Sequence, residues 1–345
     1  MNVAVIGSTL NTYYGIEQIA KYHKIKALFA LPPDLGLKKA RYTNFEDQVN
    51  RYNFDIFYDE HNLKDENVVK KFKDLSLDLI IELGSSKIIP KEVIETAKCG
   101  CIGSHGGKLP YIRGGASMNW AIINGEDKWG VSLYHLTPDV DEGMPIETID
   151  FNIELKDDIN TVHNKSDLAV GKMLDNYLKD FKPGEKQASN LEVIKIPPSP
   201  KEYNWQEIVN WNRFVKSEYK KYKYSEKAIF LPQRKPQDGF IDWGSSSLEI
   251  YNFIRAQTGP FFPGAFTLYN NKKLFILESE TTESFGYKYE IEPGKIIEIY
   301  EDGILIKTLD NILRIKRVRL EGLPEMWTED FSYEKNLEIG DVLGR

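Results

Sequence analysis

The chain has 345 residues, of which 41% are hydrophobic and 28% charged, so the composition excludes a generally disordered protein and the length favours two folded domains. The formal net charge is −7, which argues against a surface built throughout to bind nucleic acid but leaves room for a local basic patch.

Residues 1–135 alternate short apolar runs with helical patterns. The expected strands are Val3–Ile6, Ile25–Phe29, Asp55–Tyr58 and Leu77–Glu82. Strands that alternate with helices predict an α/β domain with a mainly parallel sheet covered on both faces. Catalytic groups in such sheets lie beyond the carboxyl ends of the strands. The short strand Gly100–His105 leads into a loop rich in glycine and proline, so His105 falls where this rule places a site.

The next elements continue the same domain. Met118–Asn124 is expected to be a short helix, and Val131–Leu136 a strand that leads into the turn Thr137–Gly143. In the stretch Ile159–Phe181 the apolar residues recur at helical spacing, which predicts a long amphipathic helix.

Prolines at 183, 197, 198 and 200 indicate a linker over Lys182–Pro200. From Asp238 onward a second unit is expected. It has a helix at Ser245–Gln257 and then short strands at Ala265–Tyr269, Lys273–Glu278, Lys295–Tyr300, Gly303–Thr308 and Ile312–Leu320. Short strands separated by turns suggest a small β-barrel. The predicted division is therefore a first domain at 1–182, a connecting segment at 183–233 with a basic and aromatic helical part, and a barrel domain at 234–345.

The start of the chain has no basic segment and no long apolar stretch, so we interpret it as a buried strand and not a signal peptide. Nowhere do 18 apolar residues run together, so we expect no membrane span and no membrane partner. The two cysteines, Cys99 and Cys101, cannot supply a four-ligand zinc site and suit a reducing compartment. We therefore expect a cytoplasmic protein without a metal.

His105 is the strongest candidate for a catalytic residue. Gly103, Gly106 and Gly107 around it let the backbone approach a ligand closely. An imidazole titrates near neutrality and can give or take a proton during group transfer. Asp141 would orient the ring, although Asp139 and Glu142 compete for that role, and a structural histidine is the alternative reading.

The segment from His105 to Gly125 resembles the signature of the formyltransferases that use N10-formyltetrahydrofolate. That signature has an Asn-x-His, a leucine-proline, an arginine-glycine, a Trp-Ala-Ile and, after a further strand, an Asp-x-Gly. The last of these is Asp141-Glu-Gly143 here, and 141 − 105 = 36 residues separate it from the histidine. Arg234–Trp243, Ile254–Ala256 and Pro263–Phe266 are similar to the C-terminal region of methionyl-tRNA and sugar-nucleotide formyltransferases. The resemblance covers roughly residues 1–180 and 234–345.

The resemblance implies a Rossmann-like catalytic domain and a small OB-like barrel. It also implies that a primary amine attacks the formyl group of N10-formyltetrahydrofolate, with His105 as acid and base and Asp141 as its partner. The pterin would lie against the backbone of Ser86, Ile88 and Ile89 and of the turn at Asp139 and Val140. Residues expected to bind the acceptor are Lys108, Arg113 and Gly114.

This chain departs from the family pattern at Gly103, where the family usually has Asn. An amide there would steady the oxyanion of the tetrahedral intermediate, and its loss can cost about 10²–10³ in rate. Ser104, a backbone N–H or a water could replace it, the transferred group could differ from formyl, or the chain could bind folate or a nucleotide without catalysis. Two smaller departures are Ser117 in place of a proline and Ser86 in place of a glycine.

Residues 213–235 hold eight Lys or Arg against two Glu, a net of +6, with aromatic residues interleaved. This segment is either a solvated face or a contact for an anionic acceptor such as a nucleotide or a tRNA phosphate. The acidic overall charge leads us to expect as acceptor an amino sugar attached to a nucleotide, or another small amine. Methionyl-tRNA stays open as the acceptor, and the sequence also allows a homodimer.

Overall fold

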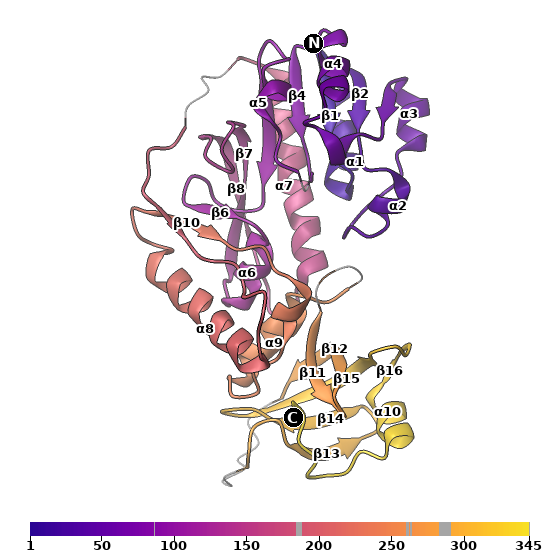
Figure 1. The fold of residues 1–345 in the computed structure, drawn as a ribbon, viewed down its shortest axis with the longest axis vertical. Helices are drawn as coiled ribbons and strands as arrows, with labels where there is room; N and C mark the ends of the chain where they lie inside the picture. Colours follow the sequence, from indigo (N-terminus) through magenta and orange to yellow (C-terminus); the bar gives the residue numbers. More distant parts are fainter. Residues whose placement is uncertain (86, 184–187, 260–261, 263, 283–290, 345) are drawn as a thin grey trace.

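The computed structural model describes residues 1–345 except 86, 184–187, 260–261, 263, 283–290 and 345. Its N-terminal unit is built on a seven-stranded sheet in the order β3-β2-β1-β4-β5-β7-β8 (Figure 1). The strands are β1 (Asn2–Ile6), β2 (Lys24–Phe29), β3 (Asp55–Phe57), β4 (Leu79–Glu82), β5 (Cys101–His105), β7 (Lys128–His135) and β8 (Pro145–Asn152). Strands β1 to β5 pair in parallel, which confirms the predicted mainly parallel sheet.

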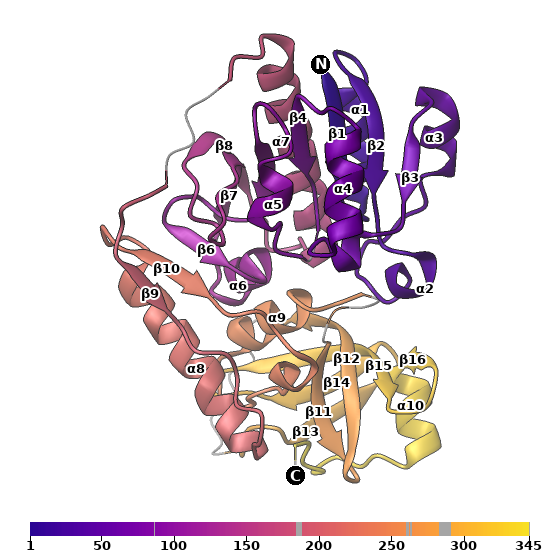
Figure 2. The same cartoon turned by 45° about the horizontal axis from the view of Figure 1, so that its top comes forward.

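Helices cover both faces of this sheet because its central strands are apolar on both sides. Val3 and Val5 of β1 face the helices α1 (Leu10–Ile19) and α7 (Ile159–Lys179). Ala4 and Ile6 face the opposite core, which contains residues of α4 (Glu66–Asp74) and α5 (Lys91–Ile94). Figure 2 shows α7 running behind the sheet on the side away from α4 and α5.

Strand β7 runs antiparallel to β5, and the edge strand β8 runs antiparallel to β7. The sequence predicted β7 but not β8. Glu147 and Asp150 interrupt the apolar alternation of β8, as charged residues often do on an edge strand. The consequence is that β5, which carries His105, has β4 on one side and β7 on the other.

The predicted linker contributes a second sheet. The short strands β9 (Val193–Lys195) and β10 (Ala228–Leu231) pair in parallel with each other, and β10 pairs with β6 (Ile112–Gly114) in the loop that follows His105. Helix α8 (Trp205–Tyr222) packs beside them and buries Ile208, Trp211 and Val215. Strands of three or four residues carry little periodic signal, which is why the sequence did not predict them.

The C-terminal unit is a six-stranded antiparallel sheet that encloses one apolar core (Figure 1). Its strands are β11 (Ala265–Tyr269), β12 (Lys272–Thr281), β13 (Ile296–Tyr300), β14 (Gly303–Lys307), β15 (Ile312–Leu320) and β16 (Glu325–Trp327). Helix α9 (Ser247–Arg255) packs against α6 (Ser117–Ile123) of the first unit, and α10 (Thr328–Lys335) packs on β15.

The remaining helical elements are short: α2 (Pro33–Gly36), α3 (Glu46–Tyr52), α6 (Ser117–Ile123) and the 3-10 turns η1 (Glu60–Asn62) and η2 (Pro236–Gly239). Within the part of the chain that the structure describes, every helix is too short or too polar to cross a membrane.

Candidate active site

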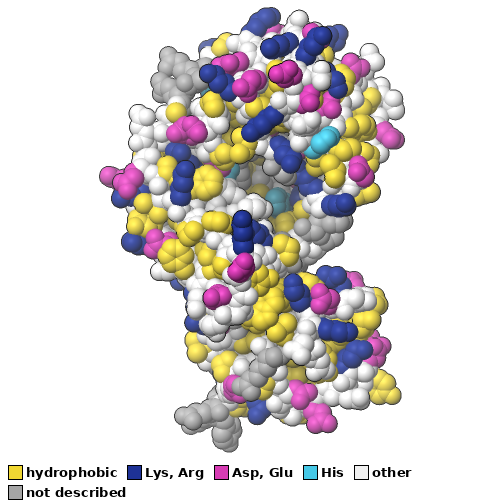
Figure 3. Space-filling model, in the orientation of Figure 1, with side chains coloured by type: hydrophobic (Ala, Val, Ile, Leu, Met, Phe, Trp, Pro, Cys, Tyr) yellow, Lys and Arg dark blue, Asp and Glu magenta, His cyan; other side chains and the backbone are white. Residues whose placement is uncertain are grey.

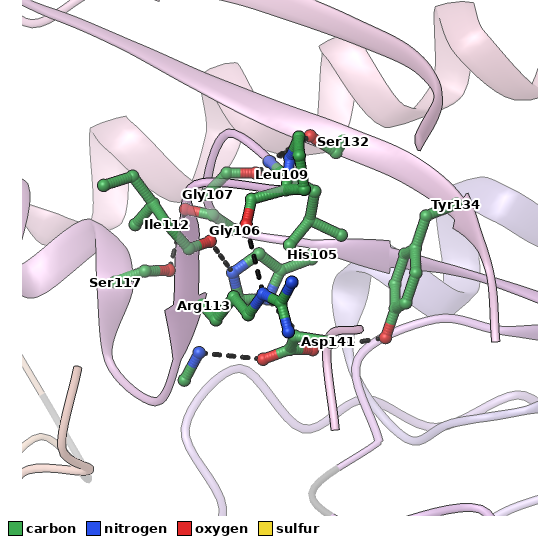
Figure 4. A network of polar contacts seen from close by, with 12 residues as sticks. His105, Gly106, Gly107, Leu109, Ile112, Arg113, Ser117, Ser132, Tyr134 and Asp141 are labelled. Atoms are coloured by element: carbon green, nitrogen blue, oxygen red, sulfur yellow. Dashed lines mark hydrogen bonds and ion pairs between the residues drawn. The ribbon is translucent and has the colours of Figure 1, made fainter. Parts of the chain in front are cut away.

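His105 is the last residue of β5, at the carboxyl end of the sheet (Figure 4). Side chains alternate along a strand, so those at 101, 103 and 105 share one face of the sheet. Cys101 on that face packs in the same core as Tyr134 of β7 and Leu136, which directly follows β7. The space-filling view shows the surface hollowed in the N-terminal unit, with a histidine side chain visible in the hollow (Figure 3).

Both ring nitrogens of His105 have partners, and the side chain is almost fully buried. Nε2 lies 2.9 Å from the carbonyl oxygen of Ile112. A carbonyl can only accept a hydrogen bond, so Nε2 carries the proton in this contact. Nδ1 lies 3.4 Å from Oδ1 of Asp141. Neither an unprotonated Nδ1 nor a carboxylate can donate, so this contact becomes a hydrogen bond only when Nδ1 takes up a proton and the ring is positively charged. Nδ1 is therefore the nitrogen placed to exchange a proton.

Asp141 is held by two further donors. The Tyr134 hydroxyl donates to Oδ1 at 3.2 Å, and the backbone N–H of Gly114 donates to Oδ2 at 2.9 Å. The turn that presents Asp141 folds tightly against β7, because a Cβ on Gly143 would lie 1.8 Å from the carbonyl oxygen of His135. The Asp-x-Gly pattern thus has a steric cause here. Asp139 on the same turn is exposed, whereas Asp141 and Glu142 are both partly buried. The contact with His105 singles out Asp141.

The loop after His105 is fixed by hydrogen bonds to neighbouring elements (Figure 4). The carbonyl oxygen of Gly106 accepts from the Ser117 hydroxyl at 2.8 Å and from the Trp129 indole at 2.7 Å. The Ser132 hydroxyl donates to the Gly107 carbonyl and accepts from the N–H of Leu109. Ser117, one of the departures from the family pattern, therefore has a structural role that proline could not supply.

Of the three residues expected to bind the acceptor, Arg113 and Gly114 lie beside Asp141, and Lys108 is directed away from it. Arg113 is buried beside Asp141, and its Nε donates to the Pro110 carbonyl at 3.1 Å. Its Nη2 is buried and forms no hydrogen bond with any described residue, and burial lowers the pKa of the guanidinium. Gly114 binds Asp141 as described. Lys108 is directed elsewhere, because its Nζ lies 2.9 Å from Asp150 on β8.

The expected folate-binding residues lie in two loops. Ile88 and Val140 are exposed, as is Asp139, so each can contact a ligand. The Ile89 side chain is buried in the sheet core, which leaves only its backbone for such a contact. Ser86 lies outside the described residues. These assignments stay predictions.

Gly103 and Ser104 lie on opposite faces of β5. Ser104 lies between Gly103 and His105 on β5, so strand alternation directs its hydroxyl to the opposite face of the sheet. The face shared by Gly103 and His105 instead carries Glu82, which pairs with Gly103 in register, and Tyr134. Sequence reasoning missed both. The available signal for Glu82 was a carboxyl group at the end of the otherwise apolar strand Leu79–Glu82.

The basic residues of 213–235 are largely neutralised within the chain. Those that form ion pairs with acidic side chains are Arg213, Lys216, Lys221, Lys223 and Lys227. Arg234 is buried and hydrogen-bonded to Gln257, Asn212 and the Asp238 carbonyl. The late strand β15 shows the same pattern, because Arg314, Lys316 and Arg317 also pair with acidic residues.

Among the described residues, no three His, Cys, Asp or Glu side chains are grouped to hold a metal ion. The site is instead a histidine and a carboxylate at the carboxyl edge of a Rossmann-like sheet, next to a buried arginine. This fold and site define an enzyme that transfers a chemical group with the help of proton movement.

The chain belongs to the formyl transferase family. Residues 1–176 match the family described as formyl transferase, and residues 234–336 match the formyl transferase C-terminal domain. Formyltetrahydrofolate is the co-substrate of this family. The expectation of a formyltransferase with a Rossmann-like domain and a C-terminal β domain is confirmed.

A methionyl-tRNA formyltransferase of Alkaliphilus oremlandii is 29% identical over 93% of this chain and 92% of its own. Two solved structures share the fold at 16% identity. HypX of Aquifex aeolicus in complex with tetrahydrofolic acid has a TM-score of 0.56 over 99% of this chain, which spans about half of that protein (50%). An N-formyltransferase of Helicobacter canadensis in complex with folinic acid and dTDP-3-aminofucose has a TM-score of 0.54 over 91% of this chain and 98% of its own.

Proposed function

We propose that this protein transfers the formyl group of N10-formyltetrahydrofolate to the primary amine of an amino sugar carried on a nucleotide. The observation that carries the catalytic part is the contact between His105 Nδ1 and Asp141 Oδ1 at 3.4 Å, with the ring anchored at Nε2. In this proposal residues 1–182 are the catalytic unit, 183–233 connect it to the C-terminal unit at 234–345, and the reaction takes place in the cytoplasm.

In the proposed mechanism His105 carries the proton, and Asp141 stabilises the positive charge that the ring acquires. As the amine attacks the formyl carbon, the nitrogen becomes acidic, and His105 Nδ1 takes its proton directly or through a water. The charge on the imidazolium is stabilised by Asp141, whose carboxylate is fixed by Tyr134 and Gly114. The proton then returns to N10 of the folate as the carbon–nitrogen bond breaks. Acid–base catalysis of this kind contributes about 10²–10⁴ in rate.

Two features support a small nucleotide-linked acceptor. Most basic side chains of α8 and β15, with the exception of Lys220 and Arg319, are paired with acidic groups of this chain, which reduces the free positive charge that binding of a tRNA backbone needs. The buried guanidinium of Arg113 keeps Nη2 without a partner among the described residues, and an anionic or carbonyl group of a small ligand would satisfy it.

The second candidate is methionyl-tRNA. It is favoured by the methionyl-tRNA formyltransferase of Alkaliphilus oremlandii, which aligns with 93% of this chain. A salt titration separates the two acceptors. Binding of tRNA would weaken by orders of magnitude between low and moderate salt because counterions are released from phosphates, whereas a small nucleotide has few phosphates to contribute.

The test is a formyl-transfer assay of the purified chain with N10-formyltetrahydrofolate and a panel of amino-sugar nucleotides and methionyl-tRNA. His105→Ala and Asp141→Ala are the site variants, and Lys98→Ala is a surface control, because its ion pair with Asp78 lies before the start of β4, at the opposite end of the sheet from His105. Formylation of an amino-sugar nucleotide that His105→Ala abolishes supports the proposal. Formylation of methionyl-tRNA alone overturns the acceptor, and full turnover by His105→Ala overturns the site.

A further inference from the structure

The carboxyl group of Glu82 occupies the space next to Gly103. Strands β4 and β5 place Glu82 directly beside Gly103 in register, so both face the same side of the sheet as His105. A Cβ built on Gly103 would lie 2.8 Å from Glu82 Oε2 and 2.6 Å from Leu136 Cδ1. A side chain at 103 would therefore require the ends of the Glu82 and Leu136 side chains to shift. The absence of an amide side chain at 103 and the presence of the Glu82 carboxyl group beside it are therefore linked by packing.

One oxygen of Glu82 is anchored and the other has no described partner. Oε1 accepts the backbone N–H of Ser85 at 2.6 Å. No residue within the described ranges forms a hydrogen bond with Oε2, the oxygen beside Gly103. The residue as a whole is 8% exposed, so the carboxyl group is largely enclosed.

The charges around Glu82 favour its neutral form. Lys39 Nζ is the cation facing it, and that ammonium donates to the Gly84 carbonyl at 2.6 Å and lies 3.5 Å from Glu60, a second and fully buried carboxylate. The single ammonium group of Lys39 therefore faces two buried carboxyl groups, those of Glu60 and Glu82. Burial raises the pKa of Glu82 to about 8, with Glu60 and Asp141 adding to the effect of burial and Lys39 and the Ser85 N–H opposing it. The Tyr134 hydroxyl faces the same region, and burial raises its pKa as well.

We propose that protonated Glu82 replaces the absent amide as the hydrogen-bond donor to the formyl oxygen in the transition state of formyl transfer. This rests on the proposed function. When the amine nitrogen bonds to the formyl carbon, the carbonyl π pair moves onto oxygen and makes an oxyanion. Glu82 keeps its proton and donates a hydrogen bond through Oε2 to that oxygen. As the pair returns to form the new amide carbonyl, the bond to N10 breaks and N10 takes the proton that His105 received from the amine.

A neutral carboxylic acid is a suitable donor in an enclosed site, because it offers an O–H at a fixed position and the low dielectric strengthens the bond. The other candidate donors, on β5 and β7, fit less well. Ser104 points to the other face of the sheet, and Tyr134 already donates its hydroxyl to Asp141. Glu82 is therefore the donor that the geometry places beside Gly103.

The first experiment compares Glu82→Gln with Glu82→Met in steady-state formyl transfer. Gln keeps an N–H donor in the same position, whereas Met fills the space without a donor. We expect kcat to fall about 10²–10³-fold in Glu82→Met with little change in KM, and to stay within about tenfold of the wild type in Glu82→Gln. Equal kcat in wild type and Glu82→Met would overturn the proposal, since it would leave Glu82 a space-filling role only.

The pH profile of kcat gives a readout that packing alone would not change. In the wild type we expect kcat to fall on the alkaline side as Glu82 loses its proton, and we expect this limb to be absent in Glu82→Gln. The same alkaline limb in both proteins would contradict the assignment. Asp167→Asn is the matched control, because burial also raises the pKa of Asp167, to about 6, but its partner is Arg41 beside α7 and not Gly103.

The double variant Glu82→Ala with Gly103→Asn restores the family's arrangement. Gly103→Asn alone should lose activity because its side chain meets Glu82, and the double variant should recover part of kcat. Tetrahydrofolate binding by calorimetry and the melting temperature show whether each variant is folded. If the wild type transfers no formyl group to any amine, the proposed function fails. If the wild type and its His105→Ala variant behave as expected but Glu82→Met is fully active, only this inference fails.

Discussion

Gly103→Ala measures how tightly Glu82 is packed against β5. The added methyl would approach Glu82 Oε2 to 2.8 Å and Leu136 Cδ1 to 2.6 Å, both closer than ordinary contacts. Overpacking of a core typically costs about 1–3 kcal/mol. The backbone at 103 is not in the left-handed region, so Ala also restricts the unfolded chain and stabilises by about 0.4–1 kcal/mol. The net expectation is a destabilisation of about 1–2 kcal/mol.

The assay is urea denaturation, in which the midpoint should fall for Gly103→Ala without a change in slope. A double-mutant cycle with Glu82→Ala identifies the contact responsible. If Glu82 is the obstacle, Gly103→Ala should cost about 1 kcal/mol less in the Glu82→Ala background, because the carboxyl group is gone and Leu136 can shift. A Gly103→Ala protein as stable as the wild type, or additive effects in the cycle, would refute the packing argument.

Three further outcomes follow from the site and its surroundings. Asp141→Asn should lower kcat about 10²–10⁴-fold with a small change in KM, because an amide cannot stabilise a charged His105, and an unchanged kcat would remove Asp141 from the mechanism. The folded-state pKa of Glu82 is raised from 4.5 to about 8, so its contribution to stability is complete below pH 4.5 and is lost as the pH rises to about 8. Glu82→Gln should therefore show a smaller loss of unfolding free energy between those pH values than the wild type, and equal pH slopes would contradict a neutral Glu82. Burial lowers the pKa of His163 from 6.5 to about 3, so its contribution is present above pH 6.5 and is lost as the pH falls towards 3. His163→Gln should reduce acid destabilisation in that range, measured as the urea midpoint at pH 7 and pH 4.5, and the same drop in both proteins would count against this.

The parallel sheet and the position of His105 could be predicted because both depend on local patterns. Apolar runs of four to six residues separated by helical stretches indicate buried parallel strands, and β1, β2 and β4 lie within a residue or two of the expected ranges. The position of His105 at the end of β5 follows from the glycine-rich loop after it. The long helix α7 was equally clear, since its apolar stripe extends over several turns.

The short strands of the connecting segment could not be predicted for the opposite reason. Strands β9 and β10 have three and four residues. They form because β10 pairs with β6, whose Ile112 lies 117 residues before its partner Ile229 (229 − 112), and β9 in turn pairs with β10. The ion pairs of the basic segment 213–235 could not be predicted for the same reason. Its lysines and arginines were visible in the sequence, but their acidic partners come from α9, from the loop after α6 and from the chain before β9.

By itself, the sequence determined the chemical inventory of the site: a histidine after a buried strand, a carboxylate in a tight turn and a glycine where an amide is usual. Only the tertiary structure decided which groups meet. It brought Glu82 from the neighbouring strand into the space beside Gly103. The physical reason is that strand alternation fixes the face of each side chain locally, whereas the pairing of β4 with β5 sets which side chains share that face.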